Sequence, residues 1–363
     1  MLFRSDFPDD EKINIEETLL SAYVMQTFDM EWGSIIAGVR IEDTEYQTVG
    51  YRLKTVSGTD INYENIAAGE KEELSVKRTY TNYLPSLHVN YDIDDERKLR
   101  LSYTTGISRP SYIEARAAAS ISEVSSAITG GNPFLKEEES WGIDAAFEWY
   151  FDEASIFSVT AFHREIDNVI SESNEKVLGS IYSDTAEEGD LWDLSAFGNG
   201  KDGQLQGIEI QLVARLDNYI EGFFSGFGIE TNIAFIDSEY TTPEGLKFAL
   251  PGQSDTNFSA SLFYEDYGFS ARVTYRYRDR WLDETETGAV FGLDSGVYWA
   301  HQMRLDAALR YDLEQLTGQK ASIFLDLNNI TDEVDVRYSG YEWNPNQIES
   351  YGRRFVAGIR YAF

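Results

Sequence analysis

Apolar and polar side chains alternate along most of this chain with a period of two, which predicts β-strands with two different faces. The C-terminal segment has apolar residues at every second position: Phe355, Ala357, Ile359, Tyr361 and Phe363. The alternation recurs in residues 207–216, 269–278 and 303–312. We count about thirteen such segments, centred near Tyr23, Val39, Val89, Tyr103, Phe147, Val159, Ile210, Ile233, Leu262, Val273, Leu305, Leu325 and Ile359. The pattern predicts an all-β fold.

The connections between these segments alternate between short and long. Short connections lie near residues 31–32, 94–95, 152–153, 221–222, 265–266 and 316–318. Long connections span residues 55–75, 107–137, 171–203, 239–255, 281–296 and 332–350. Every long connection therefore falls at the same end of the strands. Transmembrane barrels have short periplasmic turns and long extracellular loops, whereas a β-sandwich has no reason to separate its loops by length. The alternation predicts a transmembrane antiparallel β-barrel.

The length of the segments and their aromatic ends support the same prediction. The segments run for about 9 to 15 residues, and a tilted strand needs roughly 9 to 11 residues to cross a bilayer. Several apolar faces end in an aromatic residue, as the interfacial girdles of membrane barrels do: Tyr277, Tyr311, Tyr361 and Phe363.

Composition alone would suggest a soluble protein. Of the 363 residues, 42% are hydrophobic and 14% aromatic, and the mean hydropathy is −0.38. A barrel has such an average because its two faces alternate. No apolar run approaches the roughly 18 residues of a transmembrane helix. The N-terminal residues resemble no signal peptide, so we expect a leader to have been removed or the chain to begin inside a longer gene.

The charge is unevenly distributed along the chain. The formal net charge is −33, which argues against binding to nucleic acid. The acidic residues cluster in the long connections, where they form a solvated surface or attract divalent cations or a cationic ligand. The strands instead carry arginines on their polar faces: Arg272, Arg276, Arg278, Arg304, Arg310, Arg354 and Arg360. Inside a lumen these cations need partners. We expect Arg272, Arg276, Arg304 and Arg310 to face acids such as Glu209 and Asp306, or a plug, that is, a separate domain that fills the lumen.

No motif indicates catalysis or a metal. The chain has no cysteine, its three histidines are far apart in sequence, and HExxH, P-loop and GxSxG motifs are absent. We therefore expect no catalytic residue, metal or cofactor. The better candidates for ligand binding are aromatic residues in the long connections: Trp192, Phe197, Trp281, Tyr341 and Trp343. The alternative is that these side chains only pack the loops together.

Several motifs resemble those of TonB-dependent outer-membrane receptors. Residues 38–44 (GVRIEDT) resemble the family's GxRxExT strand, and residues 84–87 (LPSL) resemble its LPSLN start. Residues 99–112, with LRLSY followed by SRPSY, resemble LRxSYSxxxSRP. Residues 131–138 (GNPFLKEE) resemble GNPxLKPE with Glu137 in place of the proline, residues 148–151 (EWYF) resemble EYYF, and residues 327–332 (LNNITD) resemble LxNLTD. The order of the motifs makes the resemblance strong, and it favours a subgroup common in sphingomonads, caulobacters and xanthomonads.

The resemblance implies a barrel of 22 strands around a plug, of which residues 1–363 would form about the last thirteen. It also implies that Tyr361 and Phe363 belong to the signal read by the barrel-assembly machinery. The expected partners are outer-membrane lipid, lipopolysaccharide and, through the plug, the TonB complex. Because thirteen antiparallel strands cannot close, we expect the chain to be incomplete. The implied function is TonB-energised nutrient uptake, of a carbohydrate or siderophore. Two alternatives remain: a passive channel of about 14 strands, if residues 11–16 form another strand, and a soluble adhesin-like domain.

Overall fold

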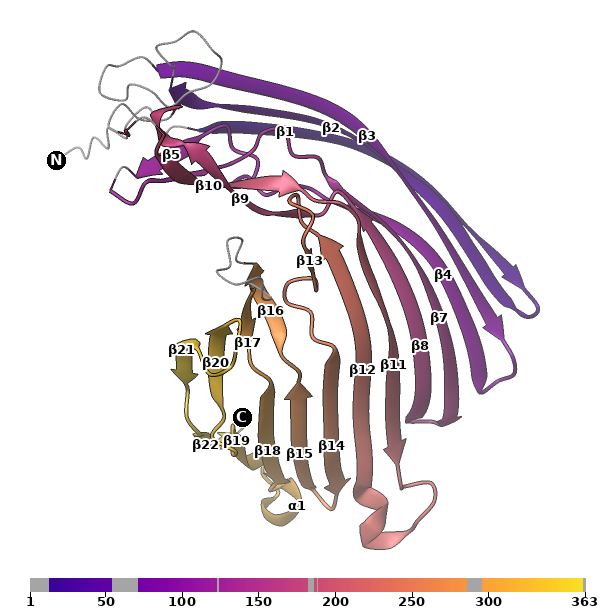
Figure 1. Ribbon diagram of the computed structural model, residues 1–363. Coiled ribbons are helices and arrows are strands. Elements are labelled where there is room, and N and C mark those ends of the chain that lie inside the picture. Colours follow the sequence, from indigo (N-terminus) through magenta and orange to yellow (C-terminus); the bar gives the residue numbers. More distant parts are fainter. Residues whose placement is uncertain are drawn as a thin grey trace, which may run out of the picture.

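The computed structural model describes residues 13–53, 71–122, 124–181, 186–187, 189–285 and 296–361. Its largest element is one antiparallel sheet that curves into a wall (Figure 1). The thirteen strands along this sheet are, in order, β1 (Asn14–Met30), β2 (Gly33–Leu53), β3 (Lys71–Asp92), β4 (Arg97–Ser108), β7 (Glu138–Asp152), β8 (Ser155–Asp167), β11 (Gly203–Arg215), β12 (Phe227–Thr241), β14 (Thr256–Asp266), β15 (Phe269–Arg278), β18 (Gln302–Asp312), β19 (Ala321–Asn328) and β22 (Arg354–Tyr361).

Each predicted segment centre lies within its own strand of this sheet, so the all-β antiparallel fold is confirmed. Consecutive strands along the sheet pair with each other, and β1 and β22 stand at its two ends. Within the described residues the wall is therefore open. Asn14, Ile15 and Glu16 are the first residues of β1, and the described part of residues 11–16 adds no fourteenth strand of its own.

The register gives the wall one apolar and one polar face. Side chains directly opposite each other in an antiparallel pair lie on the same face. One row of register partners is mostly apolar across nine strands: Tyr91, Leu99, Phe147, Val159, Ile210, Ile233, Phe258, Tyr277 and Met303. The adjacent row is polar: Lys98, Glu148, Ser158, Gln211, Asn232, Ser259, Arg276 and Arg304. The alternation read from the sequence thus separates the two faces of the wall.

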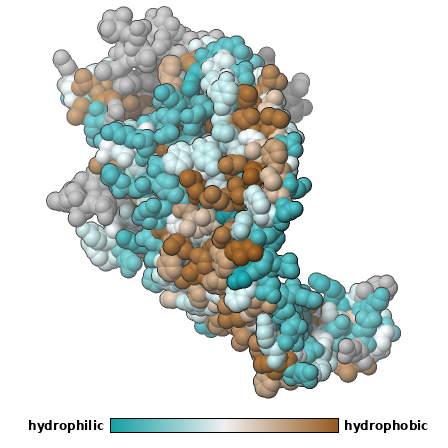
Figure 2. Space-filling view, turned by 90° about the vertical axis from the view of Figure 1, so that its right-hand side faces the viewer, coloured by the Kyte–Doolittle hydropathy of each residue, from teal (hydrophilic) through white to brown (hydrophobic). Residues whose placement is uncertain are grey.

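The apolar face is the convex one. Figure 2 views that side of the wall, and apolar side chains gather over its middle. Many large apolar residues on this face remain exposed, including Leu101, Ile208 and Leu262. Exposed apolar area of this extent on a sheet is expected where lipid replaces water as the solvent. Among the residues that the structure describes, no helix is long and apolar enough to cross a membrane.

The short and long connections lie at opposite ends of the wall (Figure 1). One of the two-residue short connections consists of Tyr267 and Gly268, with φ of 53° and 71°. Positive φ at both positions is typical of the type I′ turn, whose twist suits a hairpin. Two other short connections contain single helical turns, η3 (Gly222–Gly226) and α1 (Glu314–Thr317).

The long connections contain strands that the sequence analysis did not predict. Four form one small sheet: β5 (Ala119–Ser122), β6 (Ala127–Gly130), β10 (Leu191–Asn199) and β9 (Ile170–Leu178), the last preceding η2 (Gly179–Ile181). Four form a second sheet: β16 (Trp281–Thr285), β17 (Gly296–Trp299), β20 (Val334–Ser339) and β21 (Pro345–Ser350). A further strand, β13 (Lys247–Phe248), extends β12. We call the second of these sheets the apical sheet.

Candidate ligand-facing surface

The arginines predicted to face a lumen lie on the polar face of the wall, near its C-terminal end. Arg272 and Arg276 alternate with apolar residues on β15, and Arg304 and Arg310 do the same on β18. The register places all four on the face opposite Tyr277 and Met303. The two-residue period of the strands thus places the apolar side chains on one face of the wall and the arginines on the other.

Each of the four arginines has a carboxylate partner. The ion pairs are Arg272–Glu230 at 2.6 Å, Arg276–Asp306 at 3.2 Å, Arg304–Asp335 at 2.5 Å and Arg310–Asp326 at 3.9 Å. Asp306 is one of the two partners expected from the sequence. Glu209, the other one, forms no ion pair with any arginine in the described part of the chain.

Two recesses lie side by side on this polar face. One, of about 410 Å³, is lined by Arg272, Thr274, Arg276, Asp306, Ala307, Ala308, Asp326, Asn328, Arg354 and Val356. The other, of about 290 Å³, is lined by Asn232, Asn257, Phe258, Ser259, Arg276, Tyr277, Arg278, Gln302 and Arg304. We call the second one the arginine recess. Guanidinium and amide groups dominate its polar lining, which suits a ligand that accepts hydrogen bonds.

Arg278 joins the arginine recess to the long connections. Its guanidinium lies 3.7 Å from the ring centroid of Trp281, a cation–π contact, and its Nε donates to Ser254 Oγ at 2.8 Å. Trp281 in turn stacks on Trp299, with ring centroids 6.2 Å apart. The end of β15, the 242–255 connection and the apical sheet are therefore held together around one cation.

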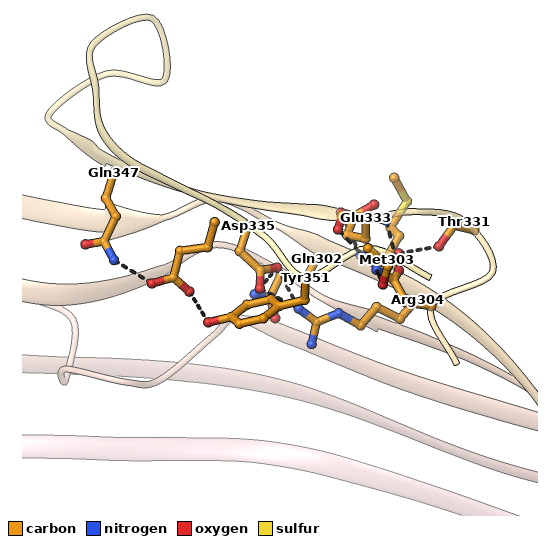
Figure 3. Close-up of polar contacts among 11 residues, drawn as sticks. Gln302, Met303, Arg304, Thr331, Glu333, Asp335, Gln347 and Tyr351 are labelled. Atoms are coloured by element: carbon orange, nitrogen blue, oxygen red, sulfur yellow. Dashed lines mark hydrogen bonds and ion pairs between the residues drawn. The ribbon is translucent and has the colours of Figure 1, made fainter. Parts of the chain in front are cut away.

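A polar cluster anchors the apical sheet to the wall (Figure 3). Asp335 of β20 is buried, and it accepts hydrogen bonds from Arg304 Nη2 at 2.5 Å and from Gln302 Nε2 at 2.7 Å. The backbone N–H of Met303 donates to Glu333 Oε1 at 3.1 Å. Charge-assisted hydrogen bonds of this kind are about twice as strong as neutral ones, so they hold β20 against the start of β18.

A second group of contacts lies beside this cluster (Figure 3). Glu349 accepts hydrogen bonds from Gln347 Nε2 and from the hydroxyl of Tyr351. The hydrogen bond to Glu349 is the main reason why the pKa of Tyr351 is raised, since ionisation would place two negative charges together. Arg337 joins β20 to β16 through Asp283 at 2.6 Å and Glu284 at 3.0 Å.

The five aromatic candidates fall into two groups. Trp192 is only 3% exposed, on β10, and Phe197 is half-buried on the same strand. Trp281 is half-buried within its stack. Tyr341 and Trp343 lie in the turn between β20 and β21, stacked with centroids 5.5 Å apart, and Trp343 is 78% exposed. Only this last pair presents a broad aromatic surface to solvent.

The predicted insertion signal is described only in part. Tyr361 is the last residue of β22, and its hydroxyl donates to Oε1 of Gln319 in the neighbouring short connection. Phe363 lies outside the described residues.

Three of the resemblance motifs meet at the other end of the wall. Arg109 of the SRP segment donates to Glu42 Oε2 at 2.5 Å and to Thr44 Oγ1 at 3.1 Å, both in the GVRIEDT strand. Asn82, just before the LPSL segment, donates to Glu137 Oε1 at 3.3 Å. Glu137, which replaces the usual proline, is thus a buried acceptor. These contacts fasten the 109–137 segment to β2 and β3, and the sequence analysis did not anticipate them.

The described residues contain no group of three or more histidine, cysteine, aspartate or glutamate side chains that could hold a metal ion. His163 contacts Glu165 at 3.0 Å and packs edge-on against Trp141. All three lie on the apolar face of the wall, where they mark the border of its apolar band.

The architecture defines a class of protein: a wall of a membrane-spanning β-barrel, with an apolar outer face and a charged inner face. The sequence matches the family described as "TonB dependent receptor-like, beta-barrel" over residues 2–330. The chain therefore belongs to the TonB-dependent receptor-like β-barrel family. A search of curated proteins found no match.

Solved structures with the same fold have low sequence identity to this chain. The ferric-catecholate import receptor Fiu of E. coli K12 is 12% identical, with a TM-score of 0.64, and the match covers 96% of this chain and 45% of that one. The hemophore receptor HasR of Serratia marcescens, solved with HasA and heme, is 15% identical, with a TM-score of 0.62 and coverage of 96% and 51%. The copper transporter OprC is 14% identical, with a TM-score of 0.65 and coverage of 96% and 48%. This chain spans about half the length of each.

Proposed function

We propose that this chain forms the C-terminal wall of a receptor that takes up a nutrient across the outer membrane with energy from the TonB complex. One observation carries the proposal. A single curved sheet is apolar outside and charged inside, and the described parts of the long connections between its strands lie at one end. This arrangement suits a wall that faces lipid, encloses a polar lumen and presents ligand-binding segments to the outside.

The nutrient belongs, in this proposal, to the carbohydrate or siderophore class. The exposed Tyr341–Trp343 stack supports it, because aromatic faces bind the apolar faces of sugars and other ring-bearing ligands. The solved relatives carry names that refer to a ferric catecholate, heme and copper. We also propose that the chain belongs to the subgroup common in sphingomonads, caulobacters and xanthomonads, which is often linked to carbohydrate uptake.

The remaining roles follow from the same proposal. Residues 1–363 form one part of the barrel domain, and arginines such as Arg272 and Arg310 face the lumen and its plug. The outer face contacts lipid and lipopolysaccharide, and Tyr361 with Phe363 is read by the barrel-assembly machinery. The protein transports its ligand without chemical change, so it is not an enzyme.

Deleting the gene tests the proposal. The deletion strain is compared with its parent for growth on single iron sources (ferric siderophores and heme) and single carbon sources (oligosaccharides), and a tonB deletion provides the control. We expect growth on one source to be lost in both mutants and restored by the gene only when TonB is present. Growth that depends on the gene but not on TonB would contradict the proposal and favour a passive channel, which single-channel conductance would then detect.

A further inference from the structure

Three guanidinium groups gather on the inner face where β15 and β18 approach the apical sheet. Arg276 and Arg304 are direct register partners, and Arg278 follows two positions along β15 on the same face. Like charges directly opposite each other destabilise a sheet. The arrangement therefore needs compensation by anions.

The described residues compensate only part of this charge. Asp306 pairs with Arg276 at 3.2 Å, and Asp335 pairs with Arg304 at 2.5 Å. Arg278 has no carboxylate partner among the described residues; its donors meet Ser254 Oγ and the carbonyl of Gly252. Three cations thus face two carboxylates, in a protein whose net charge is −33. A local excess of positive charge stands out against that background.

Neutral hydrogen-bonding groups complete the arginine recess. Asn232 and Ser259 occupy the same register row as Arg276, and within the described part of the chain their side chains form no hydrogen bond. The side chain of Arg276 is 61% exposed, so it can turn toward a ligand. The volume of about 290 Å³ is at the lower end of the range of small-molecule sites.

We infer that the arginine recess binds an anionic solute that carries hydroxyl groups, such as an acidic sugar. The planar fork of Arg276 matches the geometry of a carboxylate, a sulfate or a phosphate. Arg278 uses Nε and Nη2 for Ser254 and Gly252, and its Nη1 can donate one further hydrogen bond to the same anion. The amide and hydroxyl groups of Asn232, Asn257 and Ser259 match sugar hydroxyls. A small solute fits better than an acidic protein segment, because the recess is small and lies at the end of β15 beside the long connections. This inference rests on the proposed function and specifies its substrate class.

Glucuronate and glucose are suitable probes, because they differ by one carboxylate. We would titrate the whole chain in detergent micelles with each sugar by calorimetry. We expect saturable binding of glucuronate, with glucose at least ten-fold weaker. Arg278→Gln should weaken glucuronate binding about ten-fold, a loss typical of one charge-assisted hydrogen-bond pair. Arg310→Gln removes an arginine of the same face outside the recess, and it should leave the affinity unchanged.

Trp281 provides a second readout, because its ring contacts the Arg278 guanidinium at 3.7 Å. Glucuronate should change the tryptophan emission of the chain, and the change should disappear in Trp281→Phe. Circular dichroism confirms that each variant retains its strands. Equal binding of glucose, equal weakening by Arg310→Gln, or no binding by the folded chain would each overturn the inference. None of these outcomes affects the TonB-dependent growth test, so failure of the inference can be told from failure of the proposed function.

Discussion

The guanidinium of Arg109 donates to the carboxylate of Glu42 at 2.5 Å, across 67 positions of sequence. Glu42 is only 6% exposed, and Arg40 Nε donates to its other oxygen at 2.5 Å. Four residues further along β2, the hydroxyl of Tyr46 donates to the carbonyl of Ala115 at 2.8 Å. The long segment after β4 is therefore bound to the inner face of β2 at successive inward positions, and the two motifs that contain Glu42 and Arg109 are two halves of one contact.

Replacing Glu42 should destabilise this contact strongly. Glu42→Gln removes the carboxylate that Arg40 and Arg109 share and leaves Arg109 paired with Glu17 alone, at 3.4 Å. Removing one member of a buried ion pair costs about 3 to 5 kcal/mol. Because Arg109 is partly exposed, we expect a loss of about 2 kcal/mol in the free energy of unfolding. Urea unfolding of the chain in micelles measures it.

The matched control is Glu45→Gln, which removes the exposed pair between Glu45 of β2 and Lys77 of β3. Exposed pairs contribute about 1 kcal/mol or less. Equal losses in the two variants would show that burial of the Arg109–Glu42 pair has no special effect.

Gly131, at the start of the GNPFLKEE motif, should not tolerate a side chain. A Cβ there would lie 2.6 Å from the carbonyl oxygen of Arg116 and 2.9 Å from its nitrogen. Gly131→Ala must displace backbone, and overpacking of this kind costs about 1 to 3 kcal/mol. Limited proteolysis should then cleave the 109–137 segment faster than in the parent chain. Gly106→Ala, whose Cβ would meet only the Ser140 hydroxyl at 3.3 Å, should leave the cleavage rate near the parent value.

The wall could be predicted from the sequence because its cause is local. Lipid on one side and polar groups on the other force a two-residue period on each strand, so all thirteen strands leave their own pattern. The apical sheet leaves a much weaker one. Its strands have four to six residues, and pairs such as Val297↔Ser339 join segments far apart in sequence. Its position is set by those contacts and by the Arg304–Asp335 pair.

The candidate site could be predicted only in part for the same reason. Alternation placed Arg276 and Arg304 on the polar face, because a side chain's face depends on its own strand alone. It could not reveal that Asp335 lies against Arg304, or that Trp192 is buried beneath its own loop, because both depend on how long segments fold back on the wall. The motif resemblance pointed to Arg109 and Glu42 without indicating their contact.

The two faces of the wall should respond differently to charge. Ile210 lies on the apolar face of β11 between Val159 and Ile233, and the neighbouring Gln211 lies on the polar face. An arginine on the lipid face costs about 2 to 4 kcal/mol near the bilayer midplane. Ile210→Arg should therefore reduce the fraction of chain that inserts into liposomes, whereas Gln211→Arg should not. Equal insertion of both variants would argue against a lipid-facing role for the apolar face.

Asp167 should make the stability depend on pH. It ends β8 beyond the apolar band, and burial first, then the negative charges of Asp202 and Glu139, raise the pKa of its carboxyl. The folded state therefore holds this proton more tightly than the unfolded state. Its stabilising contribution is complete below the unfolded pKa and is lost as the pH rises through the folded pKa.

Asp167→Asn should accordingly stabilise the chain at neutral pH, by less than about 1 kcal/mol because the group is exposed. Unfolding at pH 4 and pH 7 measures the effect, and the advantage of the variant should grow with pH. Glu314→Gln, at the start of α1 in a short connection at the opposite end of the wall, provides the control. An advantage of Asp167→Asn that is larger at pH 4 than at pH 7 would contradict the repulsion inferred for this carboxylate.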